Sequence, residues 1–221
     1  QEFVFSSTCA TYGVPEGLPL GEDHPQRPIS PYGQTKLDAE GVLEEAARGW
    51  GLRIARLRYF NAAGAAPDGA HGEDHQPETH LIPLVLQVAL GQRERILVFG
   101  VDHPTRDGTC ERDYVHVDDL ADAHLRALHL LQGGTADIAC NLGTGTGHTV
   151  REVIEAARFV TGHAIPSEDA PAREGDPAGL VADGRRARSL LGWSPRRSSL
   201  EQILEDAWAW HQAHPNGYGD A

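Results

Sequence analysis

Hydrophobic residues recur along the chain with two different spacings. Short apolar runs rich in β-branched and aromatic residues alternate with longer segments whose apolar residues recur every three or four positions. The short runs predict strands, and the longer segments predict amphipathic helices. Strands are expected at residues 3–7, 52–59, 96–100 and 138–142. Helices are expected at residues 31–48, ended by Gly49 and Gly51, at 81–91, and at 118–131, capped by Asp118 or Asp119. Further helices are expected after a Thr149–Glu152 capping box, after residue 183, and from a Ser198–Glu201 capping box onward.

The strand, helix, strand order at the start of the chain predicts a right-handed parallel crossover, and therefore an α/β fold. Ligands of open α/β sheets lie outside the carboxyl ends of the strands. Ser7 and Thr8 follow the first strand, and polar and aromatic residues follow the second at Phe60 and Asn61. The alternative is that the Ser7 and Thr8 hydroxyls belong to an ordinary strand-to-loop turn. Position alone favours this alternative.

The stretch from Ser30 to Lys36 carries the strongest candidate chemistry. The chain holds 18 Arg but one Lys, and that ammonium stands four residues after Tyr32 in a predicted helix. Ser30 is a plausible N-cap and Pro31 a good first helical residue. Residues i and i+4 share a helix face, so the ammonium could lower the phenol pKa from about 10 and make it a general base. The alternative is an ordinary surface helix, because a Tyr and a Lys at this spacing form a weak pattern alone.

Composition limits the possible partners. The 221 residues carry a net charge of -13, which argues against nucleic acid and anionic membranes as partners. The longest apolar run, 81–90, is too short for a membrane span, which needs about 20 residues. Cys9, Cys110 and Cys140 are far apart and odd in number, as expected for reduced thiols in a cytoplasmic protein.

Two further patterns are interpreted as structural. His71, His75 and His80 stand among turn residues without helical i, i+4 placement, so we expect no metal site. The glycine-rich stretch 143–147 resembles a dinucleotide loop, but the G-x-G-x-x-G pattern needs glycine where His148 stands. A tight turn is the favoured interpretation of that stretch.

Taken together, the motifs resemble the extended short-chain dehydrogenase/reductase family, and within it the UDP-glucose 4-epimerases. The motifs, in the family's order, are FSSTCATYG, SPYGQTK, LRYFN, HLIP, VFG, DGTCERDYVHV, DLADAH, NLGTGTG, REGD and LGW. The resemblance implies the C-terminal portion of a Rossmann-like doubly wound parallel sheet plus a smaller α/β sugar-nucleotide-binding domain. Residues 1–64 would belong to the NAD-binding domain, and 65–221 mainly to the UDP-sugar domain, with about 114–145 returning to the sheet.

Members of this family begin with a nucleotide-binding segment that carries the phosphate-loop glycines, and no residues here replace it. The chain also contains no Met, even at its start. We therefore expect a fragment that is inactive alone, from a homodimeric, NAD-dependent enzyme that interconverts UDP-glucose and UDP-galactose.

The resemblance also implies roles for individual residues. Tyr32 would exchange the proton of the sugar O4 hydroxyl, Thr8 would hydrogen-bond the same oxygen, and Lys36 would hold the nicotinamide ribose and tune Tyr32. Tyr59 and Phe60 would contact the cofactor. The residues expected to contact the UDP-sugar are Asn61, His80, Leu81, Leu97, Val98, Phe99, Arg112, Arg173, Asp176 and Leu180. Two arginines suit a diphosphate, because they form bidentate charge-assisted hydrogen bonds.

Leu180 stands where family members place either a bulky Tyr or a smaller residue against the sugar C2 substituent. Its size predicts that N-acetylated UDP-sugars are accepted, unless Leu180 simply packs in the core.

Two other functions are considered. Sugar-nucleotide 4,6-dehydratases share the fold and the Tyr/Lys pair, but they place Asp-Glu after the active-site Thr, where Cys9 and Ala10 stand here. Neither of these residues is a suitable acid or base for eliminating water. The other alternative is a UDP-sugar-binding fragment without catalysis.

Overall fold

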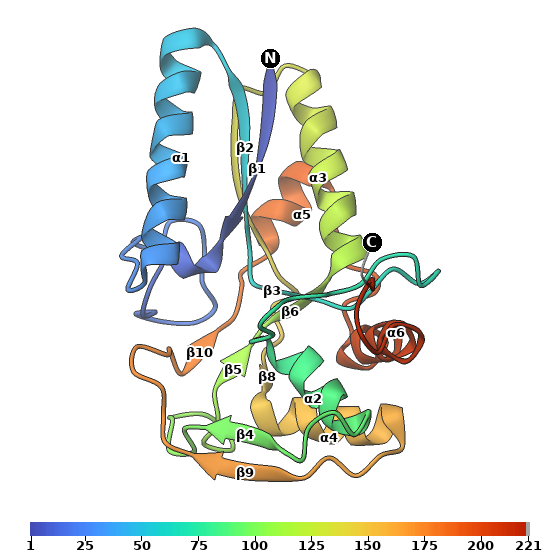
Figure 1. Cartoon of the computed structure of the whole chain (residues 1–221). Coiled ribbons are helices and arrows are strands. Elements are labelled where there is room, and N and C mark those ends of the chain that lie inside the picture. Colours follow the sequence, from blue (N-terminus) through green and yellow to red (C-terminus); the bar gives the residue numbers. More distant parts are fainter. Residues whose placement is uncertain (220–221) are drawn as a thin grey trace.

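A parallel three-stranded sheet forms one end of the molecule (Figure 1). The computed structural model describes residues 1–219. The sheet contains β1 (Glu2–Thr8), β2 (Arg53–Tyr59) and β7 (Asp137–Leu142), in the order β1-β2-β7. Helix α1 (Pro31–Trp50) lies on one side of the sheet, and α3 (Val117–Gln132) and α5 (Arg185–Leu191) lie on the other. The predicted α/β architecture with a parallel crossover is therefore present.

The register of the sheet brings two chain segments together at its carboxyl edge. The pairing runs from Glu2 opposite Arg53 to Thr8 opposite Tyr59. A short 3-10 turn, η1 (Cys9–Thr11), follows directly. Phe3 of β1 is 46% exposed, because β1 pairs only with β2 among the described strands. Only the carboxyl end of β1 is buried, so the strand is well shielded where it meets the candidate site.

Helix α1 begins and ends on the residues expected to cap it. The Ser30 side chain accepts a hydrogen bond from the Gly33 N–H, and Gly51 adopts the left-handed conformation at the other end, with φ of 68°. The helix runs two residues beyond the predicted end at Arg48. The residues of its buried face include a charged one, Glu40, with 1% of its surface exposed. A charged side chain can occupy this face because Arg58 of β2 is buried against it.

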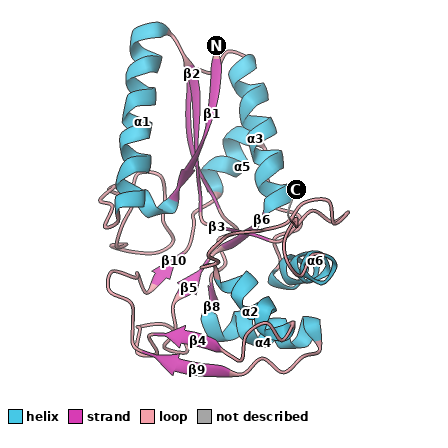
Figure 2. Ribbon diagram, in the orientation of Figure 1, coloured by secondary structure: helices cyan, strands magenta, loops and turns pink. Residues whose placement is uncertain are grey.

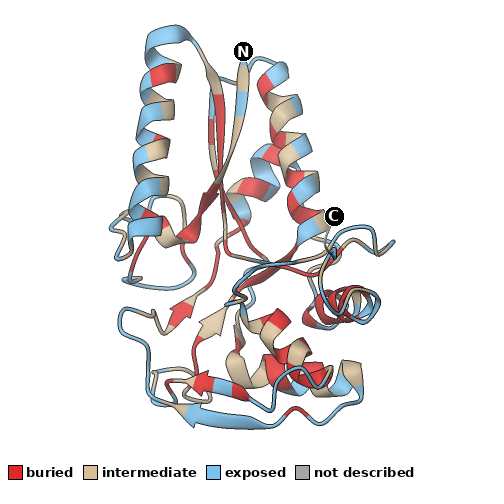
Figure 3. Cartoon of the chain, viewed as in Figure 1, coloured by how far each residue is buried: buried red, intermediate tan, exposed pale blue. Residues whose placement is uncertain are grey.

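The other end of the molecule is built from short strands and three helices (Figure 2). β4 (Ile96–Phe99) pairs with β9 (Ser167–Ala170), and β3 (Asn61–Ala63) pairs with β6 (Tyr114–His116). β5 (Glu111–Arg112) lies between β10 (Gly179–Leu180) and β8 (His148–Thr149). Helices α2 (Leu81–Ala89), α4 (Val150–Thr161) and α6 (Leu200–Ala213) enclose an apolar core that includes Leu86, Ile203 and Trp208. Red segments in Figure 3 mark the buried residues of these helices.

Two predicted helix caps are wrong, and both errors involve the same buried carboxylate. Helix α3 is capped by the His116 ring, which accepts from the Asp118 N–H. Asp119 instead accepts hydrogen bonds from the Arg197 N–H and the Ser198 hydroxyl. Because the Ser198 hydroxyl is bound to Asp119, Ser198 does not cap α6, and the Ser199 side chain caps this helix instead. The predicted Thr149–Glu152 capping box of α4 is present. Within the described residues, no helix is long and apolar enough to cross a membrane.

Candidate active site

A cavity of about 620 Å³ lies beyond the carboxyl ends of β1 and β2. It collects residues from the first turn of α1, the strand ends and the 64–80 loop. Six of the residues singled out from the sequence line it: Thr8, Tyr32, Tyr59, Phe60, Asn61 and His80. A larger hollow of about 990 Å³ lies over Arg106, but the guanidinium there is already paired with Glu111 and Glu152.

Close packing of α1 on the η1 turn positions Tyr32 beside Thr8. A β-carbon at Gly33 would lie 2.5 Å from the Ala10 carbonyl oxygen, so only glycine permits this contact. Thr8 also accepts a hydrogen bond from the Ala10 N–H at 3.1 Å, which fixes the turn. The Ser30 cap sets the start of the helix immediately before Tyr32. The sequence S-P-Y-G therefore holds the phenol at the end of β1.

The pKa of Tyr32 differs from the sequence-based expectation. Partial burial raises the pKa of Tyr32 above its ordinary value of 10.0, while a hydrogen bond with Thr8 opposes that rise. We expected Lys36 to lower this pKa. The ammonium instead donates to the Ser6 carbonyl at 3.0 Å and lies 5.8 Å from the centre of the Tyr32 ring. In this state the phenol is protonated at neutral pH.

Lys36 lies on the same helix face as Tyr32, as its spacing predicts, but it does not line the cavity. Its ammonium lies 5.1 Å from the centre of the Phe5 ring and caps the backbone of β1 near the Thr8 end. A short rotation of this flexible side chain would be needed to bring its charge to the phenol.

A buried polar network underlies the site, and sequence reasoning missed it. Arg58 donates to Glu40, to the Tyr12 hydroxyl and to Gln26, and Ser7 donates to Glu40. Burial favours a higher pKa for Glu40, but the hydrogen bonds and charge of Arg58 lower it overall. Arg56 and Arg58, within a strand whose other inner residues are apolar, were the available signal, since buried charges require partners.

The predicted diphosphate-binding residues form a second group, away from the cavity lining. Arg112 forms an ion pair with Asp176 and donates to the Pro177 carbonyl at 2.9 Å. Arg173 lies over the Phe99 ring, 3.9 Å from its centre. Both guanidinium groups are therefore held by neighbouring residues of the chain.

The remaining predicted substrate residues differ in accessibility. Val98 is completely buried and Leu81 packs against the same apolar core, whereas Leu97 is 42% exposed. Leu180 pairs with Arg112 across β10 and β5, and packs against a small apolar cluster that contains Phe60. Leu180 thus links the two groups of predicted site residues, although it does not line the 620 Å³ cavity.

The glycine-rich stretch 143–147 is a closed turn, as expected. The Asp113 carboxylate accepts hydrogen bonds from the Thr144, Gly145 and Ala182 N–H groups. Burial raises the pKa of Asp113, while these N–H groups oppose the rise. The amides that a phosphate would need are therefore already occupied by a carboxylate.

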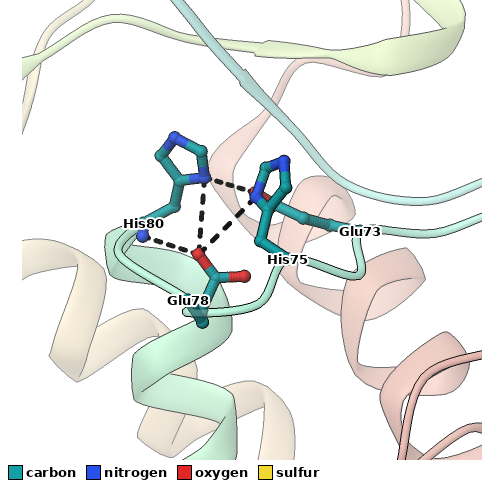
Figure 4. A group of neighbouring side chains, drawn as sticks. All are labelled: Glu73, His75, Glu78 and His80. Carbon is teal, nitrogen blue, oxygen red and sulfur yellow. Dashed lines mark hydrogen bonds and ion pairs between the residues drawn. The ribbon is translucent and has the colours of Figure 1, made fainter.

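His80 belongs to a cluster that the sequence patterns did not reveal. His75, His80, Glu73 and Glu78 converge at the rim of the cavity (Figure 4). A hydrogen bond to Glu73 raises the pKa of His80, although partial burial opposes it. The expectation of no metal ligands rested on turn residues and missing helical spacing, whereas here a folded loop brings the side chains together.

Comparison with known proteins agrees with this geometry. Residues 1–143 match the model of the NAD dependent epimerase/dehydratase family. The chain is 54% identical to the UDP-glucose 4-epimerase of Streptococcus mutans serotype c over 217 residues, which cover 98% of this chain and 65% of the relative. It is also 54% identical to the UDP-glucose 4-epimerase of Halalkalibacterium halodurans over 218 residues, which cover 99% of this chain and 65% of that relative. The chain thus spans about 65% of the length of these curated relatives.

Solved structures show the same likeness. A crystal structure of a UDP-glucose 4-epimerase superposes with a TM-score of 0.96 at 52% identity, covering 99% of this chain and 67% of that one. The Bifidobacterium longum UDP-glucose 4-epimerase, solved with NAD+ and UDP, gives a TM-score of 0.92 at 37% identity, covering 98% and 65%. The sequence match and the shared fold together show that this chain belongs to the NAD dependent epimerase/dehydratase family.

Proposed function

We propose that the protein carrying this chain is a UDP-glucose 4-epimerase, which interconverts UDP-glucose and UDP-galactose with NAD as cofactor. The observation that carries the proposal is the meeting of Tyr32 and Thr8 in one cavity at the carboxyl ends of two parallel strands. The Streptococcus mutans and Halalkalibacterium halodurans relatives, each 54% identical to this chain, are named UDP-glucose 4-epimerases.

In this proposal Tyr32 removes the proton from the sugar O4 hydroxyl and returns it after the configuration at C4 has changed. Thr8 hydrogen-bonds the same oxygen and keeps it beside the phenol. Lys36, now bound to the Ser6 carbonyl, turns toward Tyr32 and the cofactor ribose. Because the phenol pKa is raised in the present state, its role as base depends on positive charge arriving nearby.

The residues present fit the nicotinamide end of the cofactor. Tyr59 and Phe60 line the cavity with the Thr8 and Tyr32 hydroxyls, and these residues would hold the nicotinamide end. Bound NAD would supply a reversible two-electron oxidant and a positive charge beside Tyr32. Tyr32, Thr8 and Lys36 would orient the substrate against it and move the proton.

UDP would be held by the second group of residues. Arg112 and Arg173 would bind the diphosphate, and Asp176 keeps Arg112 in place until the ligand arrives. Phe99 offers a ring face that Arg173 covers at present. The full set proposed for the UDP-sugar is Asn61, His80, Leu81, Leu97, Val98, Phe99, Arg112, Arg173, Asp176 and Leu180. The binding energy of the UDP group would then retain the weakly bound sugar while its C4 is oxidised and reduced again.

The proposal extends to organisation and location. Residues 1–64 would serve the NAD-binding domain, and 65–221 mainly the UDP-sugar domain, with 114–145 returning to the sheet. The intact enzyme would be a cytoplasmic homodimer whose partners are UDP-sugars rather than nucleic acids or membranes.

A 4,6-dehydratase would need an acid and a base after Thr8. Burial raises the pKa of Cys9 to about 12, and Ala10 has no ionisable group. The residues after Thr8 therefore favour epimerisation over elimination of water.

The test is made on a chimaera that joins this chain to the remaining N-terminal part of the Streptococcus mutans relative. We expect the chimaera to interconvert the two UDP-sugars, and Tyr32→Phe to lower the rate about 10²-fold or more, because positioned acid-base catalysis has that size. Trp50→Phe changes an exposed aromatic side chain at the far end of α1 and should leave the rate unchanged. Normal turnover by Tyr32→Phe would overturn the proposed role.

A further inference from the structure

We propose that Glu73, His75, Glu78 and His80 form a binding site for a single zinc ion at the rim of the cavity. All four side chains come from one eight-residue segment that ends at the start of α2. The site is separate from the chemistry proposed for Tyr32, and it uses His80 Nδ1, which leaves Nε2 for the UDP-sugar contact proposed above.

The four ligand atoms converge at the spacing that zinc requires. All of them lie within 4.8 Å of one another. His75 Nδ1 lies 3.1 Å from Glu73 Oε1 and 3.8 Å from Glu78 Oε1, and His80 Nδ1 lies 3.4 Å from Glu78 Oε1. Zinc bonds of about 2.0–2.1 Å in tetrahedral geometry separate neighbouring ligand atoms by about 3.4 Å. The His80–Glu73 contact, at 2.5 Å, would have to lengthen most, and the pairs that lie farther apart than 3.4 Å, such as His75–Glu78 at 3.8 Å, would have to close.

His75 and His80 both direct their Nδ1 atoms toward the carboxylates of Glu73 and Glu78, as Figure 4 shows. The Glu78 side chain is 6% exposed and that of Glu73 is 20% exposed. Within residues 1–219 the ion pairs of both carboxylates are with His75 and His80, not with arginine or lysine. Two shielded carboxylates this close repel each other unless positive charge lies between them, and a divalent cation supplies it.

The surrounding backbone holds the ligands before any ion arrives. Glu78 Oε1 accepts hydrogen bonds from the Thr79 and His80 N–H groups, both at 2.7 Å. Metal-bound carboxylates are commonly oriented by such outer hydrogen bonds. The carboxylate of Asp74, the residue after Glu73, accepts a hydrogen bond from the Tyr218 N–H at 3.0 Å. This bond ties the loop to the C-terminal segment.

The ligand set favours zinc over the common hard cations. Two imidazole nitrogens and two carboxylate oxygens suit zinc and its neighbours in the first transition row. Magnesium and calcium prefer sites built from oxygen alone, with six or more ligands. Four protein ligands leave zinc no open position, so the ion would be structural.

Bound zinc would stiffen one wall of the candidate active site. Glu73, His75 and His80 all line the 620 Å³ cavity that also contains Tyr32. The ion would fasten the 73–80 segment to the first turn of α2, whose cap residue is His80. Its expected effect is a more stable cavity wall, without a part in proton transfer.

The test uses the 221-residue chain after chelator treatment and titrates it with Zn²⁺ by calorimetry, and with Co²⁺ by visible absorption. We expect one equivalent of Zn²⁺, a Co²⁺ spectrum typical of four-coordination, and a rise in Tm on adding Zn²⁺. His75→Gln and Glu78→Gln should each weaken zinc binding at least 10- to 100-fold, since even outer-sphere changes cost that much.

His71→Gln is the matched control, because His71 lines the same cavity outside the four-residue cluster. It should bind zinc as the unmodified chain does. Circular dichroism of each zinc-free variant separates loss of a ligand from loss of the fold. Absence of saturable binding by the unmodified chain, equal weakening by His71→Gln, or equally tight binding of Mg²⁺ would overturn the proposal.

Discussion

Replacing Glu40 with alanine should destabilise the chain far more than removing an exposed glutamate. Glu40 is 1% exposed and Arg58 is 4% exposed. Arg58 Nε donates to both Glu40 oxygens, at 2.9 and 3.2 Å, and its Nη2 donates to Oε2 at 2.5 Å. Glu40→Ala would remove these three hydrogen bonds and leave the guanidinium buried with only Tyr12 and Gln26 as partners.

Breaking a buried ion pair by removing one partner costs about 3–5 kcal/mol. For a chain of this size, each kcal/mol lowers Tm by roughly 2–4 °C, so we expect a decrease of roughly 6–20 °C. Urea unfolding followed by circular dichroism measures the free energy directly. Glu16→Ala is the control, because Glu16 pairs with Arg27 while both side chains are more than half exposed. That variant should lose at most about 1 kcal/mol.

The pH dependence of stability gives a second readout for Glu40. Its pKa is lower in the folded chain than the ordinary 4.5, so the unfolded state binds the proton more readily. The stabilisation is complete above about pH 4.5 and is lost as pH falls through the lower folded pKa. Glu40→Gln should lack this part of the acid sensitivity. Equal losses of stability for Glu40→Ala and Glu16→Ala would refute the reasoning.

Three other changes test neighbouring parts of the structure. Gly33→Ala should lower Tm and impair activity of the chimaera, because its β-carbon would meet the Ala10 carbonyl at 2.5 Å; unchanged Tm would contradict the close packing. The three cysteines are buried and their pKa values are raised, so a thiol reagent at pH 8 should label none before urea is added; rapid labelling of native chain would show that one is accessible. Leu180→Tyr in the chimaera should lower kcat/KM for UDP-N-acetylglucosamine more than for UDP-glucose, because overpacking costs about 1–3 kcal/mol. Equal effects on both substrates would mean that Leu180 serves only the apolar cluster.

Local patterns predicted most elements of this fold. The parallel crossover from β1 through α1 to β2 follows from apolar spacing and from the Ser30 and Gly51 caps. The cap errors at α3 and α6 have a different origin. Asp119 binds backbone N–H groups almost eighty residues away, and no local pattern contains that contact.

The candidate site was predictable where strand ends and one helix turn determine it. The strand-end position of Thr8 follows from the sheet, whereas only the family resemblance placed Thr8 and Tyr32 at one substrate oxygen; both line the same cavity. The orientation of Lys36 was not predictable, because its side chain is flexible and its ammonium hydrogen-bonds the Ser6 carbonyl rather than the Tyr32 phenol. The Glu73 to His80 cluster depends on how a loop folds back, which residue spacing alone does not encode.

Product analysis by NMR tests the central proposal most directly. The chimaera is incubated with UDP-galactose and NAD, and the sugar products are followed to equilibrium. The account predicts UDP-glucose that retains its C6 hydroxyl, in a mixture that is the same when the reaction starts from UDP-glucose. Formation of a 4-keto-6-deoxy sugar, or no conversion by a folded chimaera that binds NAD and UDP, would contradict it.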